Sequence, residues 1–223
     1  MCFPAVRNHS QRPRCLFLFL SLLALLLLAP VVNLGPGAAV MFLLLQSITL
    51  IAGISALRFR GRSLPAAVVL AVLQLAASVA ALAYQYPMAR YLALIFIILF
   101  YLYLLAHVLS YVLSREGRGV DRIIGGLSAY LLMGVAWGFL YILIEAAAPG
   151  SFATPGTDFP VDGAGRPDLI YFSFVTLTTL GFGEIVPASP LVRPITILEA
   201  LAGVFFMAVL VARLVGSYST DPE

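Results

Sequence analysis

The chain has 223 residues but no lysine, only two cysteines and few charged side chains. Asp, Glu, Lys and Arg together make up 10% of the residues, against about a quarter in a soluble domain. Cys2 and Cys15 are too few for a disulfide framework or a metal-ligand set. The net charge of +3 is too small and too scattered for a nucleic-acid surface. We therefore expect no disulfide scaffold, no metal centre and no nucleic-acid partner.

The chain also lacks the common catalytic motifs. It contains no HExxH zinc motif, no GxSxG nucleophile motif, no P-loop and no paired carboxylates within an apolar run. We therefore expect a protein that is not an enzyme, and that needs neither a cofactor nor a small-molecule substrate.

Apolar sequence, in contrast, is abundant. Apolar residues make up 62% of the chain, and its mean hydropathy is +1.04. One water-soluble core of this size could not hide so much apolar surface. A helix needs about 20 such residues to cross a bilayer, and six long runs lie at residues 15–34, 37–57, 66–84, 91–113, 123–144 and 196–212. A shorter run at 169–180 favours a re-entrant helix. The expected fold is an all-α polytopic membrane protein with six transmembrane helices.

The arginines predict how the bundle is oriented. Ten of the thirteen lie before the first run, between the second and third, between the fourth and fifth, and after the sixth. Only Arg90, Arg166 and Arg193 lie in the alternate connections. The positive-inside rule then places both termini in the cytoplasm and the long connection before the sixth run outside. We expect a protein of the cell membrane, and the lysine-free, Ala/Leu/Arg-rich composition suggests a bacterial source.

The first run has a second interpretation. Basic residues precede its apolar stretch and small residues follow at 35–39, which is the order of a cleavable signal peptide. The stretch is longer than the usual apolar region of such a peptide, so a membrane span is favoured. Cleavage would leave five spans with the same topology.

The most informative segment joins the last two runs. Pro167 and Asp168 suit the first turn of a helix, because proline needs no donor there and an acid complements the positive end. The sequence TTLGFGE follows at 178–184, where Gly181 and Gly183 permit backbone conformations closed to other residues. Non-helical backbone at membrane depth persists only where it is buried in protein or lines water. Four such strands around an axis can form rings of carbonyl oxygens that replace the water around a cation.

The sequence FVTLTTLGFGE at 174–184, together with its flanking runs, resembles the pore signature of tetrameric potassium channels. The resemblance covers 123–216, about two-fifths of the chain. It implies a homotetramer in membrane lipid that conducts K⁺ passively. The implied selectivity filter comprises Thr179, Leu180, Gly181, Phe182 and Gly183, with K⁺ held by the first four. Filter support would come from Thr176, Thr178, Glu184 and Glu199, a hinge from Gly203, and the cavity lining from Val204, Met207 and Val211.

The apolar runs, the arginines and the resemblance together divide the chain into regions. A cytoplasmic N-terminus (1–14) precedes a four-helix membrane domain (15–113), a cytoplasmic linker (114–122), the pore domain (123–216) and a short tail (217–223). Within the pore domain we expect an outer helix at 123–148, an outer loop at 149–166, a pore helix at 167–178, the filter at 179–184 and an inner helix at 194–216. Pro187, Pro190 and Pro194 should keep the chain non-helical until the inner helix begins.

Three filter positions differ from the commonest sequence, TVGYGD. Leu180 replaces valine, Phe182 replaces tyrosine, and Glu184 replaces aspartate. Phe182 lacks the hydroxyl that would anchor the filter, and Glu184 is one methylene longer. We expect faster inactivation or weaker selectivity, with conduction retained. A weakly selective cation channel and a non-conducting accessory subunit are the alternatives.

Glu199 and His107 are the ionisable residues within the apolar runs that need an explanation. A charge at mid-bilayer costs at least ~2.5 kcal/mol on insertion scales, so Glu199 must face protein or water. Its simplest interpretation is a neutral, hydrogen-bonded structural acid, and the alternative is a proton-sensitive support behind the filter. His107 has no second ligand spaced along its run, which favours a packing role.

The first four runs occupy the place of a voltage sensor but lack its arginine ladder. The fourth has only Arg90, at its outer edge, and the first three contain no acids to act as counter-charges. Each moved charge contributes only ~2.3 kcal/mol per 100 mV. We therefore expect weak or no voltage dependence.

Overall fold

The computed structural model describes residues 15–28, 38–57, 64–84, 86–113, 119–154 and 167–218. These form α1 (Leu16–Leu28), α2 (Ala38–Leu57), α3 (Leu64–Tyr84), α4 (Pro87–Leu113), α5 (Gly119–Ala147), α6 (Pro167–Leu177) and α7 (Val192–Tyr218). Two short strands, β1 (Phe152–Ala153) and β2 (Val186–Pro187), pair antiparallel. The expected all-α polytopic membrane fold is confirmed.

Within the described residues, five helices are long and apolar enough to cross a membrane: α2, α3, α4, α5 and α7. The described part of α1 has 13 residues, fewer than the roughly 20 that a span needs. The described residues therefore match five of the six expected spans, and the first, at 15–34, only in part. Several sequence predictions fall outside them, namely those on Cys2, the arginines of 7–14, 58–62 and 115–118, Arg166, the outer loop at 155–166, the small residues at 35–37 and the tail at 219–223.

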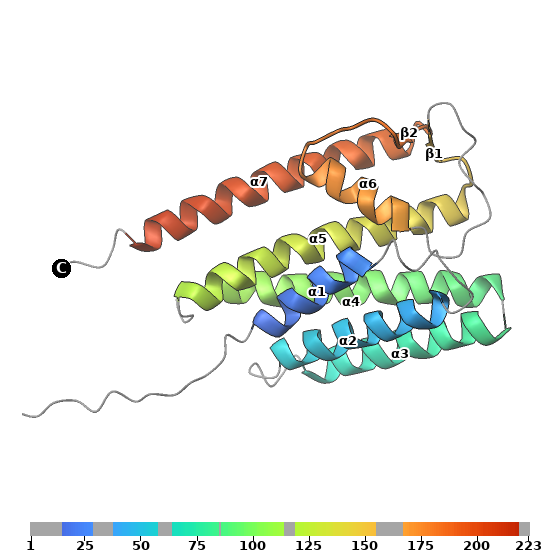
Figure 1. Cartoon of the computed structure of the whole chain (residues 1–223), viewed down its shortest axis with the longest axis horizontal. Coiled ribbons are helices and arrows are strands. Elements are labelled where there is room, and N and C mark those ends of the chain that lie inside the picture. The colour runs from blue at the N-terminus through green and yellow to red at the C-terminus, as the bar shows by residue number, and fades with distance from the viewer. Residues whose placement is uncertain are drawn as a thin grey trace, which may run out of the picture.

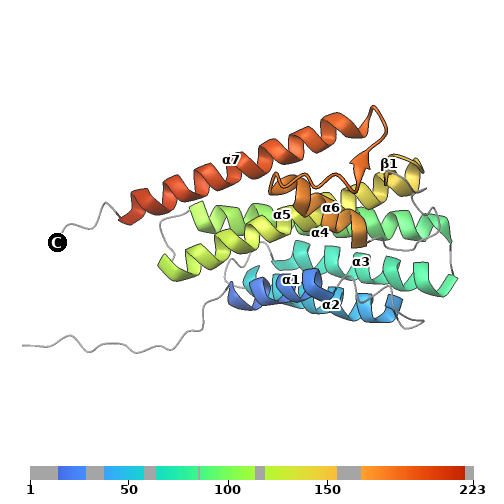
Figure 2. The ribbon, with the colours of Figure 1, turned by 45° about the horizontal axis from the view of Figure 1, so that its top comes forward.

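The helices form two side-by-side groups, α1–α4 and α5–α7 (Figures 1 and 2). Helix α4 packs against both α3 and α5, and α1 contacts α2 and α5. Tyr101 of α4 stacks on Phe139 of α5 with ring centroids 5.8 Å apart, which joins the two groups through their buried cores. The β1–β2 pair lies at the end of the molecule opposite the last turn of α7 (Figure 1).

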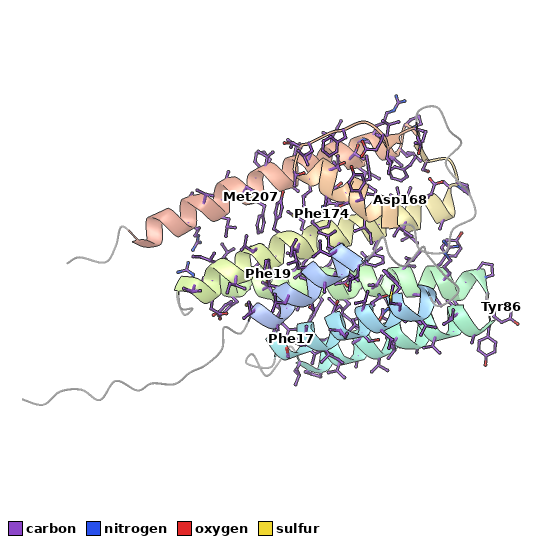
Figure 3. The ribbon with its side chains drawn as sticks, viewed as in Figure 1. Phe17, Phe19, Tyr86, Asp168, Phe174 and Met207 are labelled. Carbon is purple, nitrogen blue, oxygen red and sulfur yellow. The ribbon has the colours of Figure 1, made fainter. Side chains whose placement is uncertain are left out.

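The surface of α3 is almost wholly apolar. Its exposed side chains include Val68, Val69, Val72, Leu75 and Val79. Such an apolar surface suits contact with lipid and not with water. At the end of this helix, Tyr84 stacks on Tyr86 with centroids 6.2 Å apart, and Tyr86 projects from the end of the bundle opposite the last turn of α7 (Figure 3). Such aromatic residues suit a membrane–water interface.

Helix α7 begins two residues earlier than the prolines predict. The Ser189 hydroxyl accepts from the Leu191 N–H (3.3 Å), and the Ser189 carbonyl accepts from the Val192 N–H (3.1 Å). Pro194 thus lies in the first turn, where no N–H is needed. Helix α5 likewise begins early, at Gly119, inside the segment expected to be a linker. Asp121 lies in its first turn, where an acid complements the positive end of the helix.

Candidate functional site

Helix α6 lies directly on α5 because two glycines of α5 leave room for it. A Cβ on Gly134 would come within 2.7 Å of the Phe174 ring, and one on Gly138 within 2.8 Å of the Ile170 Cα. The two glycines are four residues apart and so share one helix face. Figure 3 shows Asp168 at the start of α6 and Phe174 farther along it. The backbone of the short helix is therefore held at a fixed depth against α5.

On its other side, the end of α6 contacts α7 through Gly203. A Cβ on Gly203 would lie 2.2 Å from the Leu177 carbonyl oxygen, so no other residue fits without movement of the backbone. The Tyr130 hydroxyl of α5 donates to the same oxygen at 3.2 Å. The resemblance predicts that Gly203 is a hinge. In the structure Gly203 lies within the continuous helix α7, and its contact with Leu177 is a second reason for a glycine here, which the sequence does not reveal.

The backbone of residues 179–183, which follows α6, alternates in handedness, and we call it the alternating segment. Thr179, Gly181 and Gly183 have φ angles of +60°, +58° and +91°, whereas the intervening Leu180 and Phe182 do not have positive φ. In a regular strand successive carbonyls point to opposite sides, and reversing every second residue turns them toward one side. Thr179 is the only non-glycine residue with positive φ in the described part of the chain. The sequence signals two of these three reversals through their glycines.

The first residues after α6 are fastened to its last turn. The N–H groups of Thr178, Thr179 and Leu180 donate to the carbonyls of Phe174 (3.0 Å), Thr176 (3.0 Å) and Val175 (2.9 Å) in that order. These bonds satisfy carbonyls that a helix end otherwise leaves open. The Thr178 hydroxyl also donates to the Phe174 carbonyl, at 2.6 Å. Any displacement of α6 would therefore move the alternating segment as well.

The outer end of the alternating segment has two anchors. Glu184 is hydrogen-bonded to the side chain of Tyr171 on α6. Strand β2 pairs with β1, and the Ala188 N–H donates to the Ser151 carbonyl at 2.9 Å. The sequence does not predict the contact between Tyr171 and Glu184, because the contact depends on how the alternating segment folds back along α6.

An aromatic cluster holds the base of this loop. The rings of Tyr141, Phe152 and Phe172 contact one another pairwise, with centroids 5.2 to 5.4 Å apart. They come from α5, β1 and α6 in that order, so one cluster fixes three elements around the site.

Glu199 of α7 is fully buried between α5 and α6. The Tyr141 hydroxyl donates to its Oε2 at 2.5 Å, and its Oε1 is hydrogen-bonded to Ser173 Oγ. Ser173 Oγ is also bonded to the Gly134 carbonyl, at 2.7 Å. One carboxyl group thus links all three helices of the site. The sequence indicates that Glu199 needs partners, but it does not indicate that Tyr141 and Ser173 supply them.

A neighbouring face of α7 is exposed. The side chains of Val204, Met207 and Val211 are 51%, 42% and 52% exposed, and their spacing places them on one stripe. Figure 3 marks Met207 on this helix. Leu180 and Phe182 of the alternating segment are also exposed. A single chain therefore leaves apolar side chains of both α7 and the alternating segment uncovered.

The described residues contain no cluster of three or more His, Cys, Asp or Glu side chains that could bind a metal ion. His107 bonds through Nδ1 to the Tyr103 carbonyl of its own helix at 2.8 Å, which suits a packing role.

This region is similar to known proteins. Residues 128–219 match the ion channel family model Ion_trans_2. One relative, named two pore potassium channel c, comes from Oryza sativa subsp. japonica. It is 38% identical over 96 residues, which are 43% of this chain and 18% of the relative. An inward rectifier potassium channel, Kirbac3.1, from Paramagnetospirillum magnetotacticum is 32% identical over 97 residues, or 42% of this chain and 28% of the relative. No solved structure matches the chain significantly.

The matched segment contains most of α5 together with α6, the alternating segment and α7. The resemblance of this segment to the potassium channel family is confirmed. The chain spans less than a third of the length of either relative.

Proposed function

We propose that this chain is one subunit of a homotetrameric potassium channel of the cell membrane. The observation that carries the proposal is the alternation of backbone handedness at Thr179, Gly181 and Gly183, directly after a short helix held between two long ones. It occurs within the segment that matches the ion channel family. An alternating strand of this kind is the backbone that a carbonyl-lined filter requires.

K⁺ would lose its water against the carbonyls of Thr179, Leu180, Gly181 and Phe182, with the Thr179 hydroxyl at the inner end. The last turn of α6 would direct the negative end of its helix dipole toward the ion path. Conduction then needs no energy input, because the ion moves down its own gradient. Gly183 and Glu184 would form the outer mouth, while Thr176, Thr178 and Glu199 support the filter from behind.

Four chains are needed because each supplies one filter strand. The uncovered apolar surface supports this assembly: Leu180, Phe182, Val204, Met207 and Val211 are all exposed in the single chain. In a tetramer the α7 stripe would line the cavity or contact neighbouring subunits. Both termini would lie in the cytoplasm, as the arginine distribution favours.

A matched pair of glycine variants tests the proposal. Gly181 and Gly150 both have positive φ, and an added Cβ would meet nothing within 4 Å at either site. Alanine at either position therefore carries a similar backbone cost of roughly 1–2 kcal/mol. Gly181→Ala should abolish K⁺ flux into proteoliposomes, whereas Gly150→Ala should leave it close to that of the wild type. Equal flux through both variants would count against a filter at this position.

A further inference from the structure

Glu199 has a hydrogen-bond arrangement that restricts where its proton can be. Its carboxyl group is fully buried, with Tyr141 bonded at Oε2 and Ser173 at Oε1. Tyr141 donates its single hydroxyl proton to the carboxyl group. The proton in the hydrogen bond between Glu199 Oε1 and Ser173 Oγ must then come either from the carboxyl group or from the serine hydroxyl.

The Ser173 hydroxyl has one proton and two oxygen neighbours. One neighbour is the Gly134 carbonyl at 2.7 Å, which can only accept, and the other is Glu199 Oε1. If Glu199 were ionised, the serine proton could satisfy only one of them, and two lone pairs would face each other at the second contact. If Glu199 is protonated, it donates to Ser173 and Ser173 donates to Gly134. Only the protonated carboxyl satisfies every contact.

The charges around the carboxyl group favour the same state. From α5, the ionisable side chains that face it are Tyr141, by its hydrogen bond, and Tyr130, by its electrostatic interaction. From α6 the facing polar group is the Ser173 hydroxyl. Arg193 of α7 donates instead to the Pro187 and Ala188 carbonyls. A buried carboxylate without a cationic partner is costly, and within the described residues the partners of Glu199 are the Tyr141 and Ser173 hydroxyls, neither of which is a cation.

Resting on the channel function proposed above, we propose that Glu199 is a positioning residue whose proton holds α6 in place behind the filter. The proton completes a chain of bonds from α7 through Ser173 of α6 to Gly134 of α5. Ser173 directly precedes Phe174 and Val175, whose carbonyls accept the N–H groups of Thr178 and Leu180. Loss of the proton removes one of these bonds, loosens α6 and disturbs the filter. Raising the pH therefore closes the channel.

The first test does not depend on conduction. Infrared titration of the purified protein in lipid vesicles should show the carbonyl stretch of a protonated carboxyl group near neutral pH. That band should vanish in Glu199→Gln and shift in frequency in Ser173→Ala, which removes its acceptor. A band that is absent in the wild type, or unchanged in Glu199→Gln, would overturn the proposal while leaving the channel function intact.

The second test measures K⁺ current against pH. Wild-type current should fall several-fold as the pH rises through the titration seen in the infrared. Glu199→Gln, which keeps a neutral side chain with a donor, should retain its current at high pH. His107→Gln changes a titratable group of α4 outside the pore segment and should keep the wild-type profile. A wild-type profile in Glu199→Gln would contradict the proposal, whereas an absence of current in every protein would count against the proposed channel function instead.

Discussion

Gly203 and Leu177 are in direct contact, since a Cβ on the glycine would lie 2.2 Å from the Leu177 carbonyl oxygen. This contact brings the inner helix α7 against the last turn of α6, immediately before the alternating segment. A flexible side chain can move away from an added methyl group, but a helix carbonyl can move only with its helix. The position of α6 therefore depends on a glycine of α7.

Gly203→Ala should lower the stability of the folded chain. Alanine is the better helix former by about 1 kcal/mol, but the backbone clash should outweigh that gain, because overpacking typically costs about 1–3 kcal/mol. The thermal unfolding midpoint in detergent measures the difference. Gly126→Ala is the matched control, since its added Cβ would meet only the flexible Leu210 side chain, at 2.7 Å. A Gly203→Ala midpoint equal to that of Gly126→Ala would show that the contact is unimportant.

Tyr171 and Glu184 should act as a pair in keeping the filter conducting. Tyr171→Phe removes the hydroxyl that is bonded to Glu184, and Glu184→Ala removes the carboxylate. Each change should speed the decay of current at constant voltage, because the outer mouth loses an anchor. The double variant should decay no faster than the faster single variant. Additive effects on the decay rate would indicate that the two residues act separately.

Conductance should depend only weakly on voltage. Helix α4 contains a single arginine, Arg90, near its first turn, and no arginine ladder follows it. The slope of the conductance–voltage curve in planar bilayers measures the number of charges that move during opening. A slope equivalent to several charges per channel would contradict the expectation.

The local sequence predicts the backbone of the site but not the contacts that hold it. Pro167 and Asp168 mark the start of α6, and Gly181 and Gly183 mark two of the three handedness reversals, because each of these residues acts through its own backbone or helix end. The third reversal, at Thr179, has no glycine to signal it.

The bonds from Tyr141 and Ser173 to Glu199 come from tertiary packing, since they join residues 58 and 26 positions apart. The bond from Ser173 to the Gly134 carbonyl depends in turn on the close approach of α6 to α5, which Gly134 and Gly138 permit. The sequence shows these glycines but not what they face. In the same way, Glu199 could be recognised as an acid that needs partners, while the identity of those partners required the structure.

The most direct test of the account is the reversal potential of the purified protein in planar bilayers, with K⁺ on one side and Na⁺ on the other. Current that reverses close to the K⁺ equilibrium potential is the predicted result, and Gly181→Ala should eliminate it. Current that reverses near zero would contradict K⁺ selectivity and indicate a weakly selective cation channel with Phe182 and Glu184 in its filter. No current across a range of pH, voltage and membrane tension would contradict conduction itself and favour an accessory subunit.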